Sequence, residues 1–405
     1  MSRILVIGGY GGFGARLVRR LLGNGHQVLV AGRSGEKAAA FCAGLAKGGL
    51  GIAEPVAADR NHGIGMVMAR ERPDLVIDAA GPFQGSGYTV PEACIAMRIP
   101  YLDLADSRDF VGGIGRLDKE AAAAGVAIVS GASSVPALSG AVARALAPPG
   151  MEVRGVEVAI SASNRAVAGP AVAAAILSYV GKPVRLWRGR RWAHAIGWQD
   201  VRRERFAVSG EAPLDRWVAL AEVPDLDLLP EALPGRPAVT FRAGTELGFQ
   251  VLALWLLSWP VRWGWIASLR GAAPWLHKLQ RITAWAGSDR SAMSVTLKAD
   301  RVARRWTLIA GEGDGPEIPT LAAELLAEDI LAGRVRCGAM HAGGLLTLDR
   351  FEPLFAGLAI RHELTEWPVL PLHARAMGAR FAALPERVRG MHVVSGDGGA
   401  SGRGR

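Results

Sequence analysis

A glycine-rich turn near the start of the chain constrains its fold more than any other feature. The turn spans residues 9–14, directly after the apolar run 4–7 and before an amphipathic helical pattern over 15–23. Its glycines match the spacing G-x-G-x-x-G, which allows a tight turn, close approach of a pyrophosphate and close packing of helix against strand. The helix N-terminus adds free N–H groups and a positive dipole end. The sequence therefore predicts a dinucleotide site that includes Gly9, Gly11, Gly12, Phe13 and Gly14.

The end of the second predicted strand indicates which dinucleotide binds. Arg33 and Ser34 follow the apolar run 27–31, at the place where the adenosine ribose is usually recognised. No acidic residue is present there to bind the 2′-hydroxyl of NAD and repel a 2′-phosphate. Arg33 and the Ser34 hydroxyl suit that phosphate, so we expect NADP rather than NAD. Ser34 also suits the N-cap of a helix beginning near Glu36.

Four further apolar runs predict more strands of the same sheet, at 53–56, 74–78, 99–104 and 126–129. Their alternation with helical patterns indicates a doubly wound parallel sheet, an α/β fold of the Rossmann type. Ligands gather at the carboxyl ends of such strands. Asp59 is thus expected near the adenine or simply in a loop. The residues expected beside the nicotinamide ribose are Ala80, Gly81, Pro82 and Phe83.

Polar residues after the next strands are candidates for proton transfer. Asp106 lies beyond the strand that contains Asp103, and a carboxylate at this edge is the simplest acid or base. Asp106 is also a candidate helix N-cap, and Asp103 is expected to bond backbone at the strand end. Ser133 and Ser134 are placed either to orient the nicotinamide amide or to start the next helix.

The second half of the chain has a different pattern. Apolar and polar residues alternate over 156–160 and 293–297, which predicts half-buried strands of an antiparallel sheet. A strand is expected at 306–309 and a helix at 318–332. We therefore divide the chain into a Rossmann domain (1–148), an α+β substrate or dimerisation domain (149–364) and a partly disordered extension (365–405).

One apolar segment has more than one interpretation. Residues 247–269 contain four tryptophans and are long enough to span a bilayer, but Pro260 and Arg262 interrupt them. A second tryptophan-bearing helix is expected at 275–285. The two suit a helical hairpin that forms core or a homodimer contact, or that lies peripherally on a membrane through 247–287. A true span is the least favoured reading, because an arginine at the membrane centre costs roughly 2.5–3.5 kcal/mol.

Composition excludes several classes of function. The net charge of +10 comes mostly from arginine, with only six lysines, and no nucleic-acid motif accompanies the basic stretch 185–205, which is expected to be a solvated hairpin. The three cysteines and eight histidines are dispersed, so neither a metal site nor a disulfide framework is predicted. With a strand at the start of the chain, this pattern favours the cytoplasm.

Several of these motifs together resemble the saccharopine dehydrogenase family. They are the glycine turn, 31–34, the Ala80–Phe83 turn, 101–103 and a Ser-Val-Pro turn at 134–136. The resemblance extends to about residue 364 and implies an NADP- or NAD-binding Rossmann domain followed by an α+β domain that covers the active site. Enzymes that form saccharopine have Asp-Pro-Gly where this chain has Ser134-Val135-Pro136-Ala137, so lysine-pathway activity is not expected. Residues 375–385 resemble the opening of a further domain, here truncated.

The glycines also fit the spacing of short-chain dehydrogenases, but none of the four tyrosines has a lysine four residues later. We therefore expect a saccharopine dehydrogenase-like, NADP-dependent oxidoreductase. It would transfer hydride between nicotinamide and an unidentified small substrate with a C=N, C=O or activated C=C bond. The alternative is a non-catalytic NADP-binding protein that acts as a scaffold or associates with the inner face of the membrane.

Overall fold

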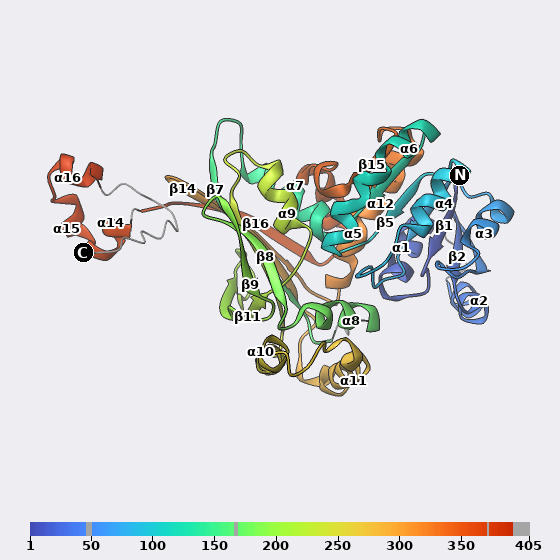
Figure 1. Ribbon diagram of the computed structural model, residues 1–405, viewed down its shortest axis with the longest axis horizontal. Helices are drawn as coiled ribbons and strands as arrows, with labels where there is room; N and C mark the ends of the chain where they lie inside the picture. The colour runs from blue at the N-terminus through green and yellow to red at the C-terminus, as the bar shows by residue number, and fades with distance from the viewer. Residues whose placement is uncertain (46–50, 166–168, 371, 392–405) are drawn as a thin grey trace.

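Seven parallel strands build the first sheet of the computed structural model, which describes residues 1–45, 51–165, 169–370 and 372–391. Apolar residues alternate between its two faces: Ile4 and Val6 face one core, and Leu5 and Ile7 the other. The sheet lies at the right of Figure 1. Its order is β15-β6-β5-β4-β1-β2-β3, with β1 Arg3–Ile7, β2 Gln27–Gly32, β3 Ile52–Ala57, β4 Leu75–Asp78, β5 Tyr101–Asp103, β6 Ala127–Ser130 and β15 Gly338–His341.

Helices cover both faces of this sheet, as the doubly wound prediction requires. One face packs against α1 and the other against α3, α4 and α6. These helices connect successive parallel strands. The bounds are α1 Gly12–Gly23, α2 Gly35–Ala43, α3 Ile64–Glu71, α4 Thr89–Met97, α5 Arg108–Gly113, α6 Asp118–Ala124 and α7 Ser139–Leu146.

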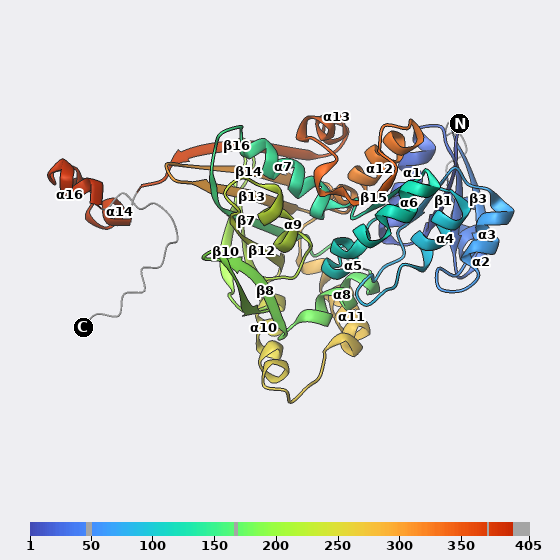
Figure 2. The same cartoon turned by 45° about the horizontal axis from the view of Figure 1, so that its top comes forward.

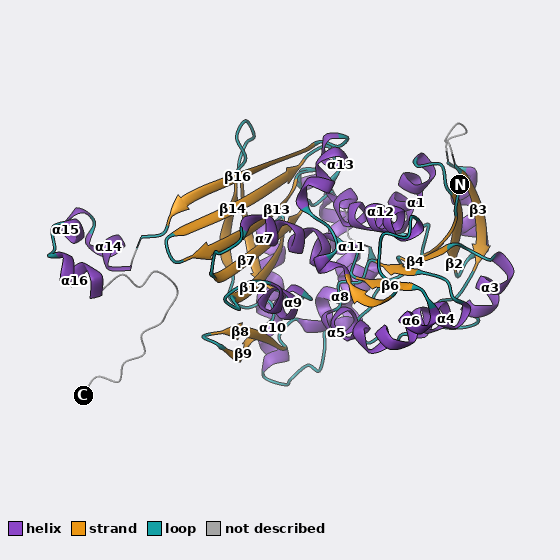
Figure 3. Cartoon of the chain, turned by 90° about the horizontal axis from the view of Figure 1, so that it is seen from above, coloured by secondary structure: helices purple, strands orange, loops and turns teal. Residues whose placement is uncertain are grey.

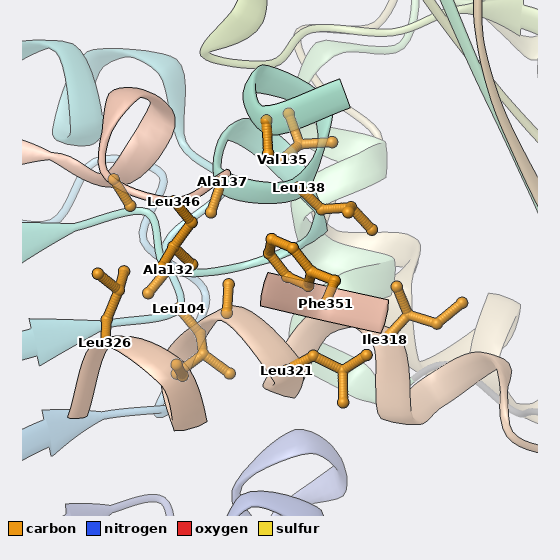
Figure 4. Packing of buried hydrophobic residues seen from close by; sticks show 14 of the residues in the cluster. Leu104, Ala132, Val135, Ala137, Leu138, Ile318, Leu321, Leu326, Leu346 and Phe351 are labelled. Carbon is orange, nitrogen blue, oxygen red and sulfur yellow. The ribbon is translucent and has the colours of Figure 1, made fainter. Parts of the chain in front are cut away.

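The chain returns to the first sheet almost two hundred residues after leaving it. Helix α12 (Ile318–Leu331) packs on α1, where Arg20 binds Glu317 at 3.0 Å and Glu324 at 3.1 Å. Strand β15 pairs with β6. Figure 4 shows the packing beneath, where α12 meets the segments that follow β5 and β6; the labelled residues are Leu104, Ala132, Val135, Ala137, Leu138, Ile318, Leu321, Leu326, Leu346 and Phe351. The predicted division at residue 148 did not include this return.

The second sheet is mixed rather than purely antiparallel. Strands β7 and β12 run parallel because the chain crosses over between them, and the remaining neighbours are antiparallel. Figure 3 shows the two sheets in orange with helices between them. The order is β10-β11-β12-β7-β13-β14-β16, with β7 Val153–Ala162, β10 Arg202–Phe206, β11 Leu214–Leu220, β12 Ala238–Thr245, β13 Ser291–Ala299, β14 Val302–Ala310 and β16 Ile360–Pro368.

The remaining elements pack against the second sheet or lie beyond it. The first part of the basic stretch forms the predicted hairpin, β8 (Pro183–Arg188) with β9 (Arg191–Ile196), but its end belongs to β10 of the second sheet and Trp198 is buried, so the stretch is not solvated throughout. The apolar segment forms α10 (Gly248–Arg262), and α11 (Ala273–Thr283) follows it; both lie with α8 (Pro170–Tyr179) at the lower edge of Figures 1 and 2. No helix among the described residues is long and apolar enough to cross a membrane. The other helices are α9 Asp225–Ala232, α13 Glu352–Ala356, α14 Leu372–Met377, α15 Ala379–Ala382 and α16 Glu386–Met391.

The predicted C-terminal extension begins inside β16, which continues to Pro368 as an edge strand of the second sheet. Helices α14, α15 and α16 then lie apart from both sheets, at the left of Figure 1. The glycine-rich end, for which the sequence predicts disorder, lies outside the described residues.

Candidate functional site

The glycine turn connects β1 to α1 at the carboxyl edge of the first sheet. Gly8 has φ +77°, a conformation that favours glycine. A side chain at Gly14 would overlap the Gly8 carbonyl oxygen, whereas the position of a Gly12 side chain is open space. Helix α1 begins at Gly12 without a capping side chain, so its first N–H groups point out of the helix end. These features fit a bound diphosphate.

A hydrogen bond joins Tyr10 of the glycine turn to Ser34, which follows β2. The Tyr10 hydroxyl accepts a hydrogen bond from the Ser34 N–H at 3.1 Å, and its ring lies against Gly32 where no side chain would fit. The Ser34 hydroxyl accepts from the Lys37 N–H at 3.2 Å, so Ser34 is the N-cap of α2. Arg33 is exposed beside it. Arg33 is thus accessible to a 2′-phosphate, and the Ser34 hydroxyl can still donate a hydrogen bond.

Asp59 lies in the loop after β3 and contributes to the structure of that loop. Its carboxylate accepts the Asn61 N–H at 2.9 Å. This hydrogen bond, with the nearby charges of His62 and Arg33, lowers the pKa of Asp59. The carboxylate therefore stays ionised close to Arg33.

The neighbouring Arg60 is a site residue that the sequence reasoning missed. Its guanidinium contacts the buried Asp78 carboxylate at 3.1 Å, donates to the Ala80 carbonyl and lies 4.7 Å above the Phe83 ring. Burial raises the pKa of Asp78 to about 6, and Arg60 opposes that rise. Arg60 therefore positions the loop from Ala80 to Phe83. A signal was available: Asp78 ends a fully apolar strand and needs a cation.

A second buried carboxylate joins β5 to β6. Asp103 accepts hydrogen bonds from the N–H groups of Ala105 and Gly131, at 2.9 and 2.8 Å, and from the Ser130 hydroxyl at 3.0 Å. Burial raises its pKa to about 6 despite these donors. This confirms the structural role expected for Asp103, which fixes the loop leading to Ser133 and Ser134.

Asp106 follows β5 at the carboxyl edge of the first sheet, on the side of the second domain. It is exposed, and its carboxylate accepts a hydrogen bond from the Gln84 amide at 3.1 Å, so it links the β5 end to the loop after β4. Desolvation by the surrounding protein raises its pKa. Its charge also helps to raise the pKa of Tyr179, on α8 of the second domain. The N-cap of α5 is Ser107 instead.

The second domain faces this edge through α8 and a polar hollow. Ala171 of α8 lies near Gly81 of the loop after β4. Next to Asp106, the buried Arg108 binds Asp227 of α9 at 2.6 Å and the Arg185 carbonyl at 2.8 Å. A hollow of about 290 Å³ is lined by Arg108, Asp109, Pro183, Arg185, His194 and Glu222. A small molecule held here would contact both domains.

The described residues contain no cluster of three or more His, Cys, Asp or Glu side chains able to hold a metal ion. The pieces that the structure does bring together, at one edge of the first sheet, are the glycine turn, Arg33, the loop from Ala80 to Phe83 and Asp106.

A comparison with known protein families shows which cofactor this edge of the first sheet binds. Residues 4–129 match the model of the saccharopine dehydrogenase NADP binding domain. This part of the chain is an NADP-binding domain of the saccharopine dehydrogenase type. The matched region holds all four pieces of the edge, so the first sheet is its NADP-binding domain, as the sequence predicted. The chain is thus an NADP-dependent oxidoreductase.

The chain is also similar to solved structures. Apo saccharopine dehydrogenase (L-Glu forming) from Saccharomyces cerevisiae is similar over 90% of this chain and 100% of its own, with a TM-score of 0.58 and 12% identity. An amine dehydrogenase from Mycobacterium smegmatis is similar over 86% and 95%, with a TM-score of 0.46 and 12% identity. A search of curated protein sequences found no match. At 12% identity, the first likeness shows that the chain has the same overall fold and no more.

Proposed function

We propose that the protein transfers hydride between NADP and a small substrate held at the mouth between its two domains. The substrate would carry a C=N, C=O or activated C=C bond. The observation that supports the proposal is the position of Asp106: its carboxylate accepts a hydrogen bond from Gln84 of the loop after β4, and its charge acts on Tyr179 of the second domain. Asp106 would thus serve as the proton-transfer group beside the second domain.

Each piece of the edge has a role in this proposal. The N–H groups at the start of α1 would bind the diphosphate, because Gly12 leaves the approach open. Arg33 and Ser34 would hold the 2′-phosphate, and the loop from Ala80 to Phe83 the nicotinamide ribose. When bound, NADP supplies or accepts the hydride at C4 of its nicotinamide. Asp106 would give a proton to, or take it from, the substrate atom next to the reacting carbon.

Calorimetric titration of the purified protein with NADPH and NADH tests the cofactor roles. We expect tighter binding of NADPH, and Arg33→Ala should weaken NADPH roughly 10- to 100-fold while NADH changes little, since a charge-assisted hydrogen bond contributes about 1.5–3 kcal/mol. Arg19→Ala, an exposed arginine on the far part of α1, serves as the matched control. Equal loss of both nucleotides in Arg33→Ala would contradict the assignment.

Turnover tests the role of Asp106. NADPH oxidation would be followed against panels of imines, ketoacid-plus-amine pairs and enones. With an active substrate, Asp106→Asn should lower kcat by about 100-fold or more without changing NADPH affinity. In NADPH oxidation Asp106 would have to be protonated to give its proton to the substrate. Because its pKa is raised, activity should persist to a higher pH than the usual pKa of an aspartate allows and fall as pH rises further. Tight NADPH binding with no oxidation on any panel would favour the non-catalytic alternative.

A further inference from the structure

The helices α10 and α11 carry a large apolar surface that the fold leaves uncovered. We call the segment 247–287 the tryptophan hairpin. Its exposed side chains include Leu256, Trp263, Trp265, Trp275, Ile282 and Trp285, with exposed fractions between 55% and 82%. Large apolar side chains so exposed, gathered in one segment of the chain, mark an interaction site.

The packing of α10 is complete without this surface. One face of the helix, with Val251, Leu254 and Val261, packs against Ala173 and Leu177 of α8. The opposite face is equally apolar but faces outward. A helix that is apolar all round is normally buried all round. The outward face of α10 therefore requires a partner that the described part of the chain does not supply.

The charge of the tryptophan hairpin indicates what that partner is. The segment contains Arg262, Arg270, Lys278 and Arg281 but no aspartate or glutamate. The Arg262 guanidinium lies 5.2 Å from the Trp259 ring centre, and the Lys278 ammonium 5.9 Å from that of Trp275. Cations thus lie among exposed indoles. A surface that is both apolar and free of negative charge is complementary to an apolar layer bordered by anions.

A second copy of the chain fits this surface less well. A two-fold contact would bring two copies of a positively charged segment together, with no carboxylate in the segment to pair its cations. A phospholipid bilayer complements both the apolar side chains and the positive charge of the hairpin. Tryptophan and arginine are common in its interfacial layer, and acidic headgroups would pair the cations.

The hairpin is too short to cross a bilayer. Helix α10 has 15 residues, or about 22 Å at 1.5 Å per residue, against a hydrocarbon core of about 30 Å. We propose that the tryptophan hairpin docks the protein onto the surface of an anionic phospholipid bilayer. Since α8 lies between the hairpin and Gly81 of the cofactor loop, docking would hold the mouth between the domains close to the lipid.

Co-sedimentation of the full chain with vesicles tests the proposal. Vesicles of phosphatidylcholine alone would be compared with vesicles containing phosphatidylserine. We expect binding to the anionic vesicles, weak binding to the neutral ones, and release by salt. The double variant Trp265→Ala with Trp285→Ala should bind at least about tenfold more weakly, since it removes two large exposed aromatic groups. A charge variant, Arg270→Glu with Lys278→Glu, should lose the preference for anionic lipid.

The matched control is Trp367→Ala, which removes an exposed tryptophan of β16 outside the hairpin; it should bind as wild type does. Unchanged circular dichroism and NADPH affinity would show that the variants fold. The proposal is overturned if the wild type does not bind anionic vesicles, or if the hairpin variants bind as well as wild type. Sedimentation velocity distinguishes the other occupant: a dimer that the double tryptophan variant dissolves would assign the surface to a second copy.

Discussion

At the scale of single residues, the cofactor turn depends on one position where no side chain fits. A methyl group at Gly14 would overlap the Gly8 carbonyl oxygen, a backbone atom that cannot move without opening the turn. Gly23, on the same helix, has no atom near the position of its missing side chain. The two glycines differ only in their surroundings, so they make a matched pair.

We therefore expect Gly14→Ala to weaken NADPH binding at least about tenfold and to lower the free energy of unfolding by roughly 1–3 kcal/mol. Gly23→Ala should leave NADPH binding unchanged and stabilise the helix by up to about 1 kcal/mol. Calorimetry and urea unfolding measure both effects. Wild-type NADPH affinity in Gly14→Ala would show that the turn is not the diphosphate site.

Asp225, a buried residue far from the cofactor edge, lowers the stability of the folded protein by an amount that depends on pH. Asp225 is fully buried on α9, neither of its carboxyl oxygens has a well-formed hydrogen bond among the described residues, and the nearby Ser139 hydroxyl offsets little of its desolvation. Burial raises its pKa to about 7. In the unfolded chain an aspartate has a pKa of about 3.9. The folded state therefore holds a proton that the unfolded state has lost.

The sign of the effect follows from that difference. The cost of Asp225 is absent below about pH 4, grows as pH rises and is complete above about pH 7. Asp225→Asn removes it, so at pH 8 the variant should be more stable than wild type by roughly 2–4 kcal/mol, and at pH 4 the two should be equal. Urea unfolding across this range measures it. Asp349→Asn, which removes an exposed carboxylate, controls for net charge; an equal gain at all pH values would refute the assignment.

At the scale of elements, α12 and β15 complete the first domain from a distance. Helix α12 covers apolar residues that follow β5 and β6, including Leu104, Ala132 and Leu138 (Figure 4). Arg20 and Asn24 of the first domain bond Glu324, whose side chain is mostly buried. Without α12 these apolar side chains would face water, at a cost of about 25 cal/mol per Å².

We therefore expect a fragment of residues 1–148 to lack a cooperative unfolding transition by circular dichroism and to aggregate. Joining residues 314–345 to it through a flexible glycine-serine linker should restore cooperative unfolding and NADPH binding. The same linker followed by residues 372–391 is the control, because α14, α15 and α16 pack on neither sheet. A cooperative fragment of residues 1–148 would support the division at that residue.

At the scale of the whole molecule, the proposed chemistry lies where the first domain contacts the second. Arg108, only two residues after Asp106, bridges to Asp227 of the second domain, and the hollow beside it is lined from both domains. The contact between the two domains therefore rests on the ion pairs of Arg108 together with the core that α12 helps to build. The tryptophan hairpin lies on the same side as α8.

The local features of this protein could be predicted from its sequence. Glycine spacing, strand periodicity and the N-cap at Ser34 depend on neighbours within a few residues, which is why the Rossmann sheet, the NADP domain and the β8–β9 hairpin were predicted correctly. The roles assigned to Arg33, Asp59, the loop from Ala80 to Phe83 and Asp106 stay predictions. Arg60 was missed because its partners, Asp78 and Ala80, come from another strand.

The sequence by itself determined the elements, the cofactor turn and the apolar character of the hairpin, because these follow from residue size, hydrophobic period and backbone freedom. Only the tertiary structure decided that α12 and β15 return to the first sheet, that β7 and β12 run parallel, and that α10 keeps one apolar face outside. Those outcomes depend on which distant surfaces bury each other. Hydrophobic burial has no direction, so the pattern along the chain shows which surfaces must be buried but not which distant segment packs against them.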